Sequence, residues 1–183
     1  MENYKKNLEI LKKNHVYSEE MEHDACGVGL IASTEGKKSR KIVEYGIEAL
    51  KAVWHRGAVD ADGKTGDGAG VHVEIPKDFF VEKIEVTGHT HDNTEICVGM
   101  IFLPRNDYAA QESCKTIVES ELTKNNFSIY GWRQVPVNPK VLGEKAFQTM
   151  PEIIQVLFKS NDTELLNKDL ERKIYETRRI IEN

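Results

Sequence analysis

Residues 57–70 read Gly-Ala-Val-Asp-Ala-Asp-Gly-Lys-Thr-Gly-Asp-Gly-Ala-Gly, and this stretch decides how the chain on either side of it can fold. It holds five of the 13 glycines of the chain within 14 residues. Glycine has no Cβ, so it is favoured where the backbone needs unusual dihedral angles or where another group must come close. We therefore predict a loop over residues 57–70 that is shaped for a tight turn or for a ligand.

Two known loop templates fit this glycine-rich loop poorly. A phosphate-binding P-loop has four residues between its first glycine and its Gly-Lys pair, whereas five residues separate Gly57 from Gly63. A P-loop also follows a strand and opens a helix, whereas this loop follows a predicted helix and precedes a predicted strand. A calcium loop could start at Asp60, but Lys64 and Thr65 stand where an oxygen ligand and a turn glycine belong. We therefore expect neither a bound nucleotide nor calcium.

Apolar periodicity divides the rest of the chain into helices and strands. Ser39 can cap a helix that precedes the loop. In a later helix we expect four residues to face inward: Ala110, Ile117, Val118 and Leu122. Strands and helices mix without a strict βαβ rhythm, which favours an α+β fold over a doubly wound sheet. The predicted strands and extended segments cover residues 26–33, 71–75, 96–103, 127–137 and 152–158, the last of them central. The predicted helices cover residues 40–53, 78–84 and 107–124, and a final helix runs from a cap at Asp162 or Thr163 to about residue 182.

The overall composition is that of a globular protein and excludes several classes of function. The chain has 183 residues and a net charge of −5, which argues against a nucleic-acid partner because a phosphate backbone needs a basic face. The apolar stretches are short, so we predict no transmembrane helix, no secretory signal and no membrane partner. Three cysteines without a C-x-x-C motif suit a reducing compartment, which predicts a cytoplasmic protein.

Cys26 is the first candidate for chemistry outside the loop. It opens a predicted strand directly after a charged segment, and Gly27 and Gly29 lie on one face of that strand, where they leave room for a ligand or another backbone. On composition alone, a small buried cysteine is the better interpretation. Residues 89–92, with two histidines, could belong to a metal site, but without a partner at metal-site spacing we favour a solvated polar loop and expect no metal.

Three segments read together change the interpretation of Cys26. They are Asp24-Ala-Cys-Gly-Val-Gly29, His55-Arg-Gly-Ala58 and Ala61-Asp-Gly-Lys-Thr-Gly-Asp-Gly-Ala-Gly70. In order and spacing they resemble the amino-terminal glutaminase domain of glutamate synthases, a class II glutamine amidotransferase of the amino-terminal nucleophile (Ntn) hydrolase type. The resemblance implies an α+β fold, the Ntn-hydrolase-like αββα sandwich with two sheets between helical layers. It also implies a propeptide-like leader at residues 1–25 and a partial amidotransferase domain at residues 26–183.

The resemblance assigns roles to single residues of these segments. In such enzymes the leader is removed and Cys26 becomes the first residue, whose thiol attacks glutamine and releases ammonia and then glutamate. The free α-amino group, with a pKa of roughly 7.7–8.0 against roughly 8.5 for the thiol, is matched to take the thiol proton. Arg56 would hold the α-carboxylate of glutamine. Gly57, Asp67 and Gly68 complete the substrate-binding set, although for Asp67 we favour the loop backbone as the partner.

The resemblance also indicates what the rest of such an enzyme supplies. The oxyanion hole of the family uses an Asn-Gly pair, and this chain has no Asn-Gly dipeptide, so we expect an incomplete sandwich. Flavin mononucleotide (FMN) and an iron–sulfur cluster belong to the synthase part. Cys97 and Cys114 are too few and wrongly spaced for a cluster, so we expect no cofactor in this chain. The expected partners are glutamine and the remainder of a glutamate synthase polypeptide, or a companion synthase subunit, which passes the ammonia to 2-oxoglutarate.

Two alternative functions stay open on the sequence. The chain could be unprocessed and non-catalytic, binding glutamine weakly or docking a partner. It could also be another class II amidotransferase, such as an amidophosphoribosyltransferase or a glucosamine-phosphate synthase, although the long string at residues 62–70 argues against these. Labelling of Cys26 by a covalent glutamine analogue separates the catalytic from the non-catalytic interpretation.

Overall fold

The computed structural model describes residues 6–7, 9–10, 12–13, 27–54, 57–165 and 167–183. The predicted leader at residues 1–25 therefore lies mostly outside the described residues, as does Cys26. The chain divides into two compact units, one of Met1–Ala58 and Gly66–Val71 and the other of Val59–Thr65 and His72–Asn183. The glycine-rich loop contributes residues to both units.

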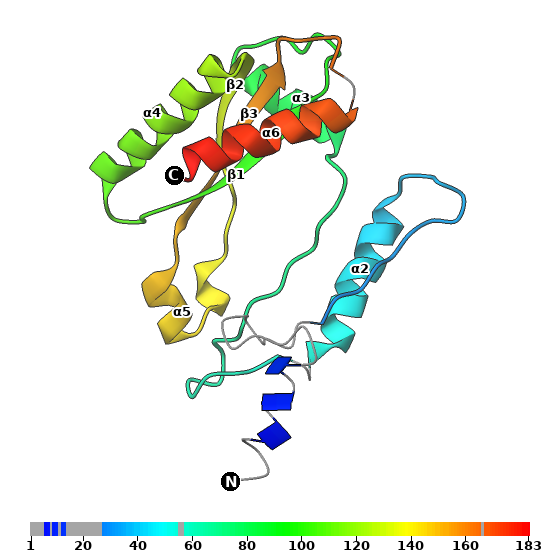
Figure 1. The fold of residues 1–183 in the computed structure, drawn as a ribbon, viewed down its shortest axis with the longest axis vertical. Helices are drawn as coiled ribbons and strands as arrows, with labels where there is room; N and C mark the ends of the chain where they lie inside the picture. The colour runs from blue at the N-terminus through cyan, green and yellow to red at the C-terminus, as the bar shows by residue number, and fades with distance from the viewer. Residues whose placement is uncertain (1–5, 8, 11, 14–26, 55–56, 166) are drawn as a thin grey trace. The chain divides into compact units, whose positions relative to one another are not determined.

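The described part of the first unit is built around one helix, α2 (Arg40–Ala52), which agrees with the predicted helix. Its apolar stripe is half-buried, and Val71 passes alongside it, with its Cγ1 4.0 Å from where a Cβ on Gly46 would lie. Ser39 occupies the N-cap position in an extended conformation, but its side chain makes no capping hydrogen bond. Residues 27–39 run out and turn back into α2 (Figure 1), with Gly36 at a φ of +65° in the turn.

The strands predicted on either side of α2 are wrong. Residues 27–33 form no strand, and Val28 and Leu30 are 94% and 90% exposed. Residues 71–75 are likewise irregular and partly exposed. An apolar run becomes a strand only where a neighbouring strand accepts its backbone hydrogen bonds, and among the described residues no strand pairs with either segment.

The second unit contains a three-stranded antiparallel sheet (Figure 1). The strands are β1 (Cys97–Leu103), β2 (Phe127–Gln134) and β3 (Glu152–Ser160), in the spatial order β1-β3-β2. Cys97 pairs with Phe158 on one side of β3, and Phe127 pairs with Ser160 on the other. The central position of β3 confirms the prediction and explains why five consecutive residues, 154–158, are buried, because a central strand is covered on both faces.

Helices cover both faces of this sheet. On one face lie α4 (Tyr108–Lys124) and α6 (Asn167–Ile181), and on the other lies α3 (Lys77–Val86). In Figure 1, α6 (red) crosses in front of the strands and α3 lies behind them. The core beneath α4 and α6 comprises Cys97, Val118, Leu122, Phe127, Val156, Phe158 and Leu170. The core beneath α3 comprises Phe80, Ile84, Ile96, Tyr130 and Leu157. The short helices η2 (Pro139–Val141) and α5 (Glu144–Thr149) connect β2 to β3.

Two details of the predicted helices need correction. Ile117 was expected to face the core, but it is 51% exposed, and α4 instead buries Gln111 with Val118 and Leu122. The last helix begins at Asn167 and not at a cap on Asp162 or Thr163. The Asp162 carboxylate accepts a hydrogen bond from the backbone N–H of Glu164 at 3.2 Å, so it stabilises a separate turn before the helix.

The fold class is α+β, as predicted. The described residues form one three-stranded sheet with helices on both faces. The second sheet of an αββα sandwich is not among the described residues, so that finer architecture stays a prediction. In the same part of the chain, no helix is long and apolar enough to cross a membrane.

Candidate active site

The predicted site residues fall into two groups. Cys26 and Arg56 lie outside the described residues, so the structure does not describe the candidate nucleophile or the candidate carboxylate-binding side chain. Gly57, Asp67 and Gly68 are described and belong to the first unit. The geometry of the site is therefore built from the glycine-rich loop.

The carboxylate of Asp67 closes the loop. Its Oδ2 atom accepts a hydrogen bond from the backbone N–H of Ala58 at 2.8 Å. The backbones come close at the same place, because a Cβ on Gly66 would lie 3.2 Å from the carbonyl oxygen of Ala58. This is the backbone role favoured for Asp67 on the sequence, and it orders the loop on both sides of the bond.

The two predicted glycines shape the backbone in different ways. The N–H of Gly57 donates to the carbonyl oxygen of Trp54 at 3.0 Å, shortly after α2. Gly68 has a φ of +96°, a conformation that side chains with a Cβ rarely adopt. Gly68 is thus required by the backbone itself, as the abundance of glycine predicted.

The part of the loop that belongs to the second unit is ordered by Asp62. Its Oδ1 atom accepts hydrogen bonds from the backbone N–H groups of Lys64 at 2.9 Å and Thr65 at 2.7 Å. Its Oδ2 atom accepts from the Thr65 hydroxyl at 2.6 Å, and the N–H of Asp60 donates to the carbonyl oxygen of Thr65 at 2.7 Å. The Thr65 hydroxyl, and then the two backbone amides, hold the pKa of the Asp62 carboxyl well below its usual range. Asp62 is therefore ionised, and its carboxylate holds the turn at residues 60–65 together.

This clamped turn contacts α5, which the sequence analysis did not anticipate. The Nζ of Lys145 lies 2.5 Å from Oδ2 of Asp60, and the N–H of Ala146 donates to Oγ1 of Thr65 at 3.3 Å. Gly143, which precedes α5, is buried. No short-range sequence pattern predicts a contact between segments this far apart in the chain.

The histidines at residues 89–92 are not simply a solvated loop. Both ring nitrogens of His91 are buried, and neither has a hydrogen-bond partner. The ring of His91 packs edge-on against Tyr130, with centroids 6.4 Å apart. Asp92 forms an ion pair with Lys159 and accepts a hydrogen bond from the Tyr130 hydroxyl at 3.3 Å. Within the ranges that the structure describes, no group of three His, Cys, Asp or Glu residues could hold a metal ion.

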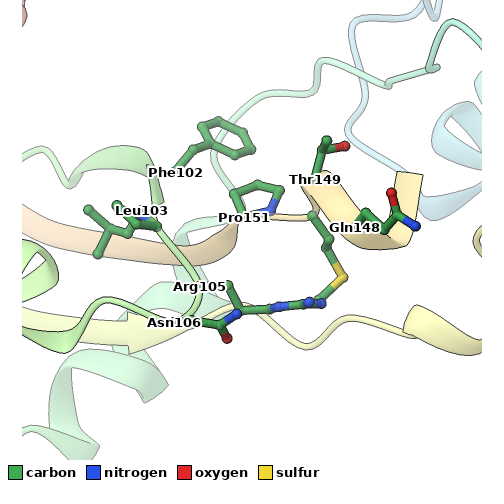
Figure 2. A pocket seen from close by; sticks show the side chains of 9 residues that line it. Phe102, Leu103, Arg105, Asn106, Gln148, Thr149 and Pro151 are labelled. Atoms are coloured by element: carbon green, nitrogen blue, oxygen red, sulfur yellow. The ribbon is translucent and has the colours of Figure 1, made fainter. Parts of the chain in front are cut away.

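A hollow of about 430 Å³ lies at one end of the sheet (Figure 2). It is formed by the end of β1 and the turn after it, and by the end of α5 and the turn after that. Its lining contains no cysteine, histidine or carboxylate and none of the predicted site residues, so it offers no thiol nucleophile and no general acid or base of those types. The lining residues are Phe102, Leu103, Pro104, Arg105, Asn106, Gln148, Thr149, Met150 and Pro151.

Comparison with known families gives one match over most of the chain. The family described as class II glutamine amidotransferases matches residues 26–183. The match begins at Cys26 and includes the glycine-rich loop, the sheet and the helices of the second unit.

The curated relatives that this chain resembles are glutamate synthases. The large chain of the NADPH glutamate synthase of Azospirillum brasilense is 51% identical over 179 residues, which cover 98% of this chain and 12% of that protein. The chloroplastic ferredoxin-dependent glutamate synthase 2 of Arabidopsis thaliana is 39% identical over 175 residues, covering 94% of this chain and 11% of that protein. In Synechocystis, ferredoxin-dependent glutamate synthase 2 is 37% identical over 161 residues, covering 87% of this chain and 10% of that protein. The chain thus spans about a tenth of the length of these relatives.

Proposed function

Because the chain belongs to the class II glutamine amidotransferases, we propose that it is the glutaminase domain of a glutamate synthase and hydrolyses glutamine to glutamate and ammonia through Cys26. The observation that carries the proposal is the family match that begins at Cys26 and runs to residue 183. The identity to glutamate synthase large chains supports this subclass over other class II amidotransferases.

The proposed chemistry needs Cys26 at the start of the mature chain. While Ala25 is attached, the nitrogen of Cys26 is an amide and cannot act as a base. Once residues 1–25 are removed, the free α-amino group takes the thiol proton, and the thiolate attacks the side-chain amide carbon of glutamine. The C–N bond breaks, and ammonia leaves with the proton held by the α-amino group. Water then hydrolyses the γ-glutamyl thioester to glutamate and regenerates the thiol.

The proposed substrate contacts use residues that follow α2 in the chain. Arg56 binds the α-carboxylate of glutamine, since a guanidinium group can bind both oxygens at once. Gly57 and Gly68 shape the backbone beside the substrate. Asp67 acts through the loop, because its carboxylate oxygen is already engaged by the N–H of Ala58. Among these residues, Arg56 is the one that we expect to change the affinity for glutamine directly.

The same proposal assigns the cofactors of the whole enzyme to the part outside this domain. FMN and the iron–sulfur cluster belong to the remainder of the polypeptide or to a companion subunit, where ammonia meets 2-oxoglutarate. The cysteines of the described sheet and helices do not suit a cluster, because Cys97 is buried in an apolar core and Cys114 lies on α4. We place the domain in the cytoplasm on its cysteine pattern, and we propose that further strands complete an Ntn-type αββα sandwich.

The experiment that tests this function labels the full polypeptide with a diazoketone analogue of glutamine, which alkylates an activated thiol that recognises glutamine. We expect one adduct, on Cys26, in protein whose amino-terminal sequence starts at that residue. Cys26→Ser should remove the adduct, and Cys114→Ser should keep it. If protein that starts at Cys26 and is folded gains no adduct there, the non-catalytic alternative replaces this proposal.

A further inference from the structure

We propose that Gly143 and the first turn of α5 position the glycine-rich loop, by holding its residues 60–65 in one conformation against α5. This inference rests on the proposed function, since it concerns the loop that flanks the glutamine site. Gly143 and α5 are positioning groups in this scheme and do not touch the substrate.

The requirement for glycine at residue 143 is steric. A Cβ at this position would lie within 3.0 Å of three atoms: Oδ2 of Asp62, Oγ1 of Thr65 and the backbone nitrogen of Thr65. Real Cβ atoms essentially never come so close. The backbone of Gly143 has a φ of −70° and a ψ of 163°, which any residue can adopt. The absence of a side chain is therefore needed for contact with the loop and not for backbone conformation.

Two polar contacts also hold the loop against the first turn of α5. The N–H of Ala146 donates to Oγ1 of Thr65 at 3.3 Å, which satisfies one of the helix N–H groups that lack a partner within the helix. Lys145 pairs with Asp60 at 2.5 Å, but both side chains are partly exposed, so this pair contributes little on its own.

The turn at residues 60–65 is held together by its own hydrogen bonds, so a change at its contact with α5 displaces the turn as a whole. Asp62 holds Lys64 and Thr65 by three hydrogen bonds, so the turn moves as one body. Gly66 and Asp67 follow Thr65 directly in the chain. A changed conformation of Thr65 therefore strains the residues bonded to it, and a misplacement of about 1 Å at such a site can lower a rate by roughly 100-fold.

The first test compares Gly143→Ala with wild type in the full polypeptide, using two reagents on Cys26. The diazoketone analogue of glutamine reports substrate recognition, whereas iodoacetamide reports only an accessible thiolate. We expect the rate with the analogue to fall roughly 10- to 100-fold while the iodoacetamide rate stays within about twofold. Gly46→Ala in α2 is the matched glycine control, because its Cβ would meet nothing closer than 4.0 Å, and both of its rates should stay at wild-type values.

A second pair of variants keeps the inference testable if Gly143→Ala does not fold. Thr65→Val removes the hydroxyl that binds both Asp62 and the Ala146 N–H but keeps the shape of the side chain. We expect it to lose the same selective reactivity, and Thr65→Ser to recover most of it. An equal loss of both labelling rates in Thr65→Val would contradict a positioning role, as would unchanged rates.

Hydrogen exchange separates failure of this inference from failure of the proposed function. In Gly143→Ala or Thr65→Val, the amides of Thr65 and Ala146 should exchange faster than in wild type, whether or not the protein turns over glutamine. Unchanged exchange would overturn the docking of the turn on α5. Faster exchange with no loss of reactivity toward the analogue would overturn the positioning role. If wild-type Cys26 itself fails to react with the analogue, the proposed function fails, and with it the role in glutamine recognition.

Discussion

At the scale of single residues, the two described cysteines have different surroundings and should differ in reactivity. Cys97 opens β1 within the core beneath α4 and α6 and is buried, whereas Cys114 on α4 is half-buried. Burial, and to a lesser extent the charges of Glu95 and Glu171, raise the pKa of Cys97 to about 12. Because the thiolate is the reactive form, Cys97 is inert at neutral pH in the folded protein.

Cysteine labelling tests this difference. With iodoacetamide at about pH 8, we expect an adduct on Cys114 and none on Cys97 until the protein is unfolded in urea, as read by peptide mass spectrometry. The raised pKa also has a consequence for stability. It favours the folded state below the ordinary thiol pKa of 9.0, and this contribution is lost as the pH rises toward 12. Labelling of Cys97 at the same rate as Cys114 in folded protein would show that this core is open.

Leu157 is the most informative single position in the core. It has no exposed surface, and it lies in β3 on the face that α3 covers. Truncation to Leu157→Ala should lower the free energy of unfolding by about 2–5 kcal/mol, because both the apolar contacts and the filled volume are lost. Val86→Ala, at the 80%-exposed end of α3, should change it by less than about 0.5 kcal/mol. Urea denaturation measures both variants, and equal effects would contradict the assigned core.

At the scale of elements, the helices were more predictable than the strands. A helix satisfies its own backbone hydrogen bonds, so the apolar periodicity of the segments that form α2 and α4 sufficed to place both helices. A strand depends on partners that may come from anywhere in the chain. Residues 27–33 and 71–75 have the composition of strands, but among the described residues they have no neighbour to pair with. The local sequence pattern shows that a segment can form a strand. Whether it does so depends on a neighbouring strand to pair with.

Helix capping provides a matched comparison between two elements. The carboxylate of Asp107 accepts a hydrogen bond from the N–H of Ala110 at 2.9 Å, whereas Ser39 at the start of α2 makes no such bond. Asp107→Ala should therefore cost about 1 kcal/mol of stability, within a range of about 0.5–2, while Ser39→Ala should cost only a few tenths. Asp107→Asn keeps an acceptor and should stay close to wild type. Equal losses for Asp107→Ala and Ser39→Ala in urea denaturation would refute the role of the cap.

At the scale of the whole molecule, long-range contacts limit what the sequence could foretell about the site. Cys26 and the glycine-rich loop carry their signals within a few residues, and the backbone role of Asp67 was foreseeable for a short acidic side chain among glycines. The contacts of Gly143 and Ala146 with Thr65 join segments far apart in the chain, and no periodicity encodes them. The structural surroundings of Cys26 and Arg56 remain a prediction because these residues lie outside the described part.

Another long-range contact predicts how stability responds to acid. Lys159, and then Thr94, hold the pKa of the Asp92 carboxyl well below its ordinary value of 3.8, and Asp92 raises the pKa of Lys159. A lowered carboxyl pKa stabilises the fold above the ordinary value, and this stabilisation is lost as the pH falls below it.

The corresponding measurement is the urea midpoint between about pH 7 and pH 2. The wild-type midpoint should fall below about pH 4, and Asp92→Asn should flatten that fall because it removes the titrating partner. Lys159→Met, which removes the other side of the pair, should flatten it as well. A fall that is as steep in both variants as in wild type would show that other carboxyl groups cause it.

The order of the strands has a consequence for how the protein is made. Both β1 and β2 hydrogen-bond to β3, which follows them in the chain, and not to each other. During synthesis, therefore, none of the pairing between the three described strands can form until the ribosome has released residues 152–160. Until then the apolar side chains of β1 and β2 have no strand to pack beside. Pairing β1 with β3 also closes a long loop of chain, which slows folding. We therefore expect the nascent chain to depend on chaperones up to that point, and a ribosome stalled before residue 152 to hold a chain that proteases digest readily.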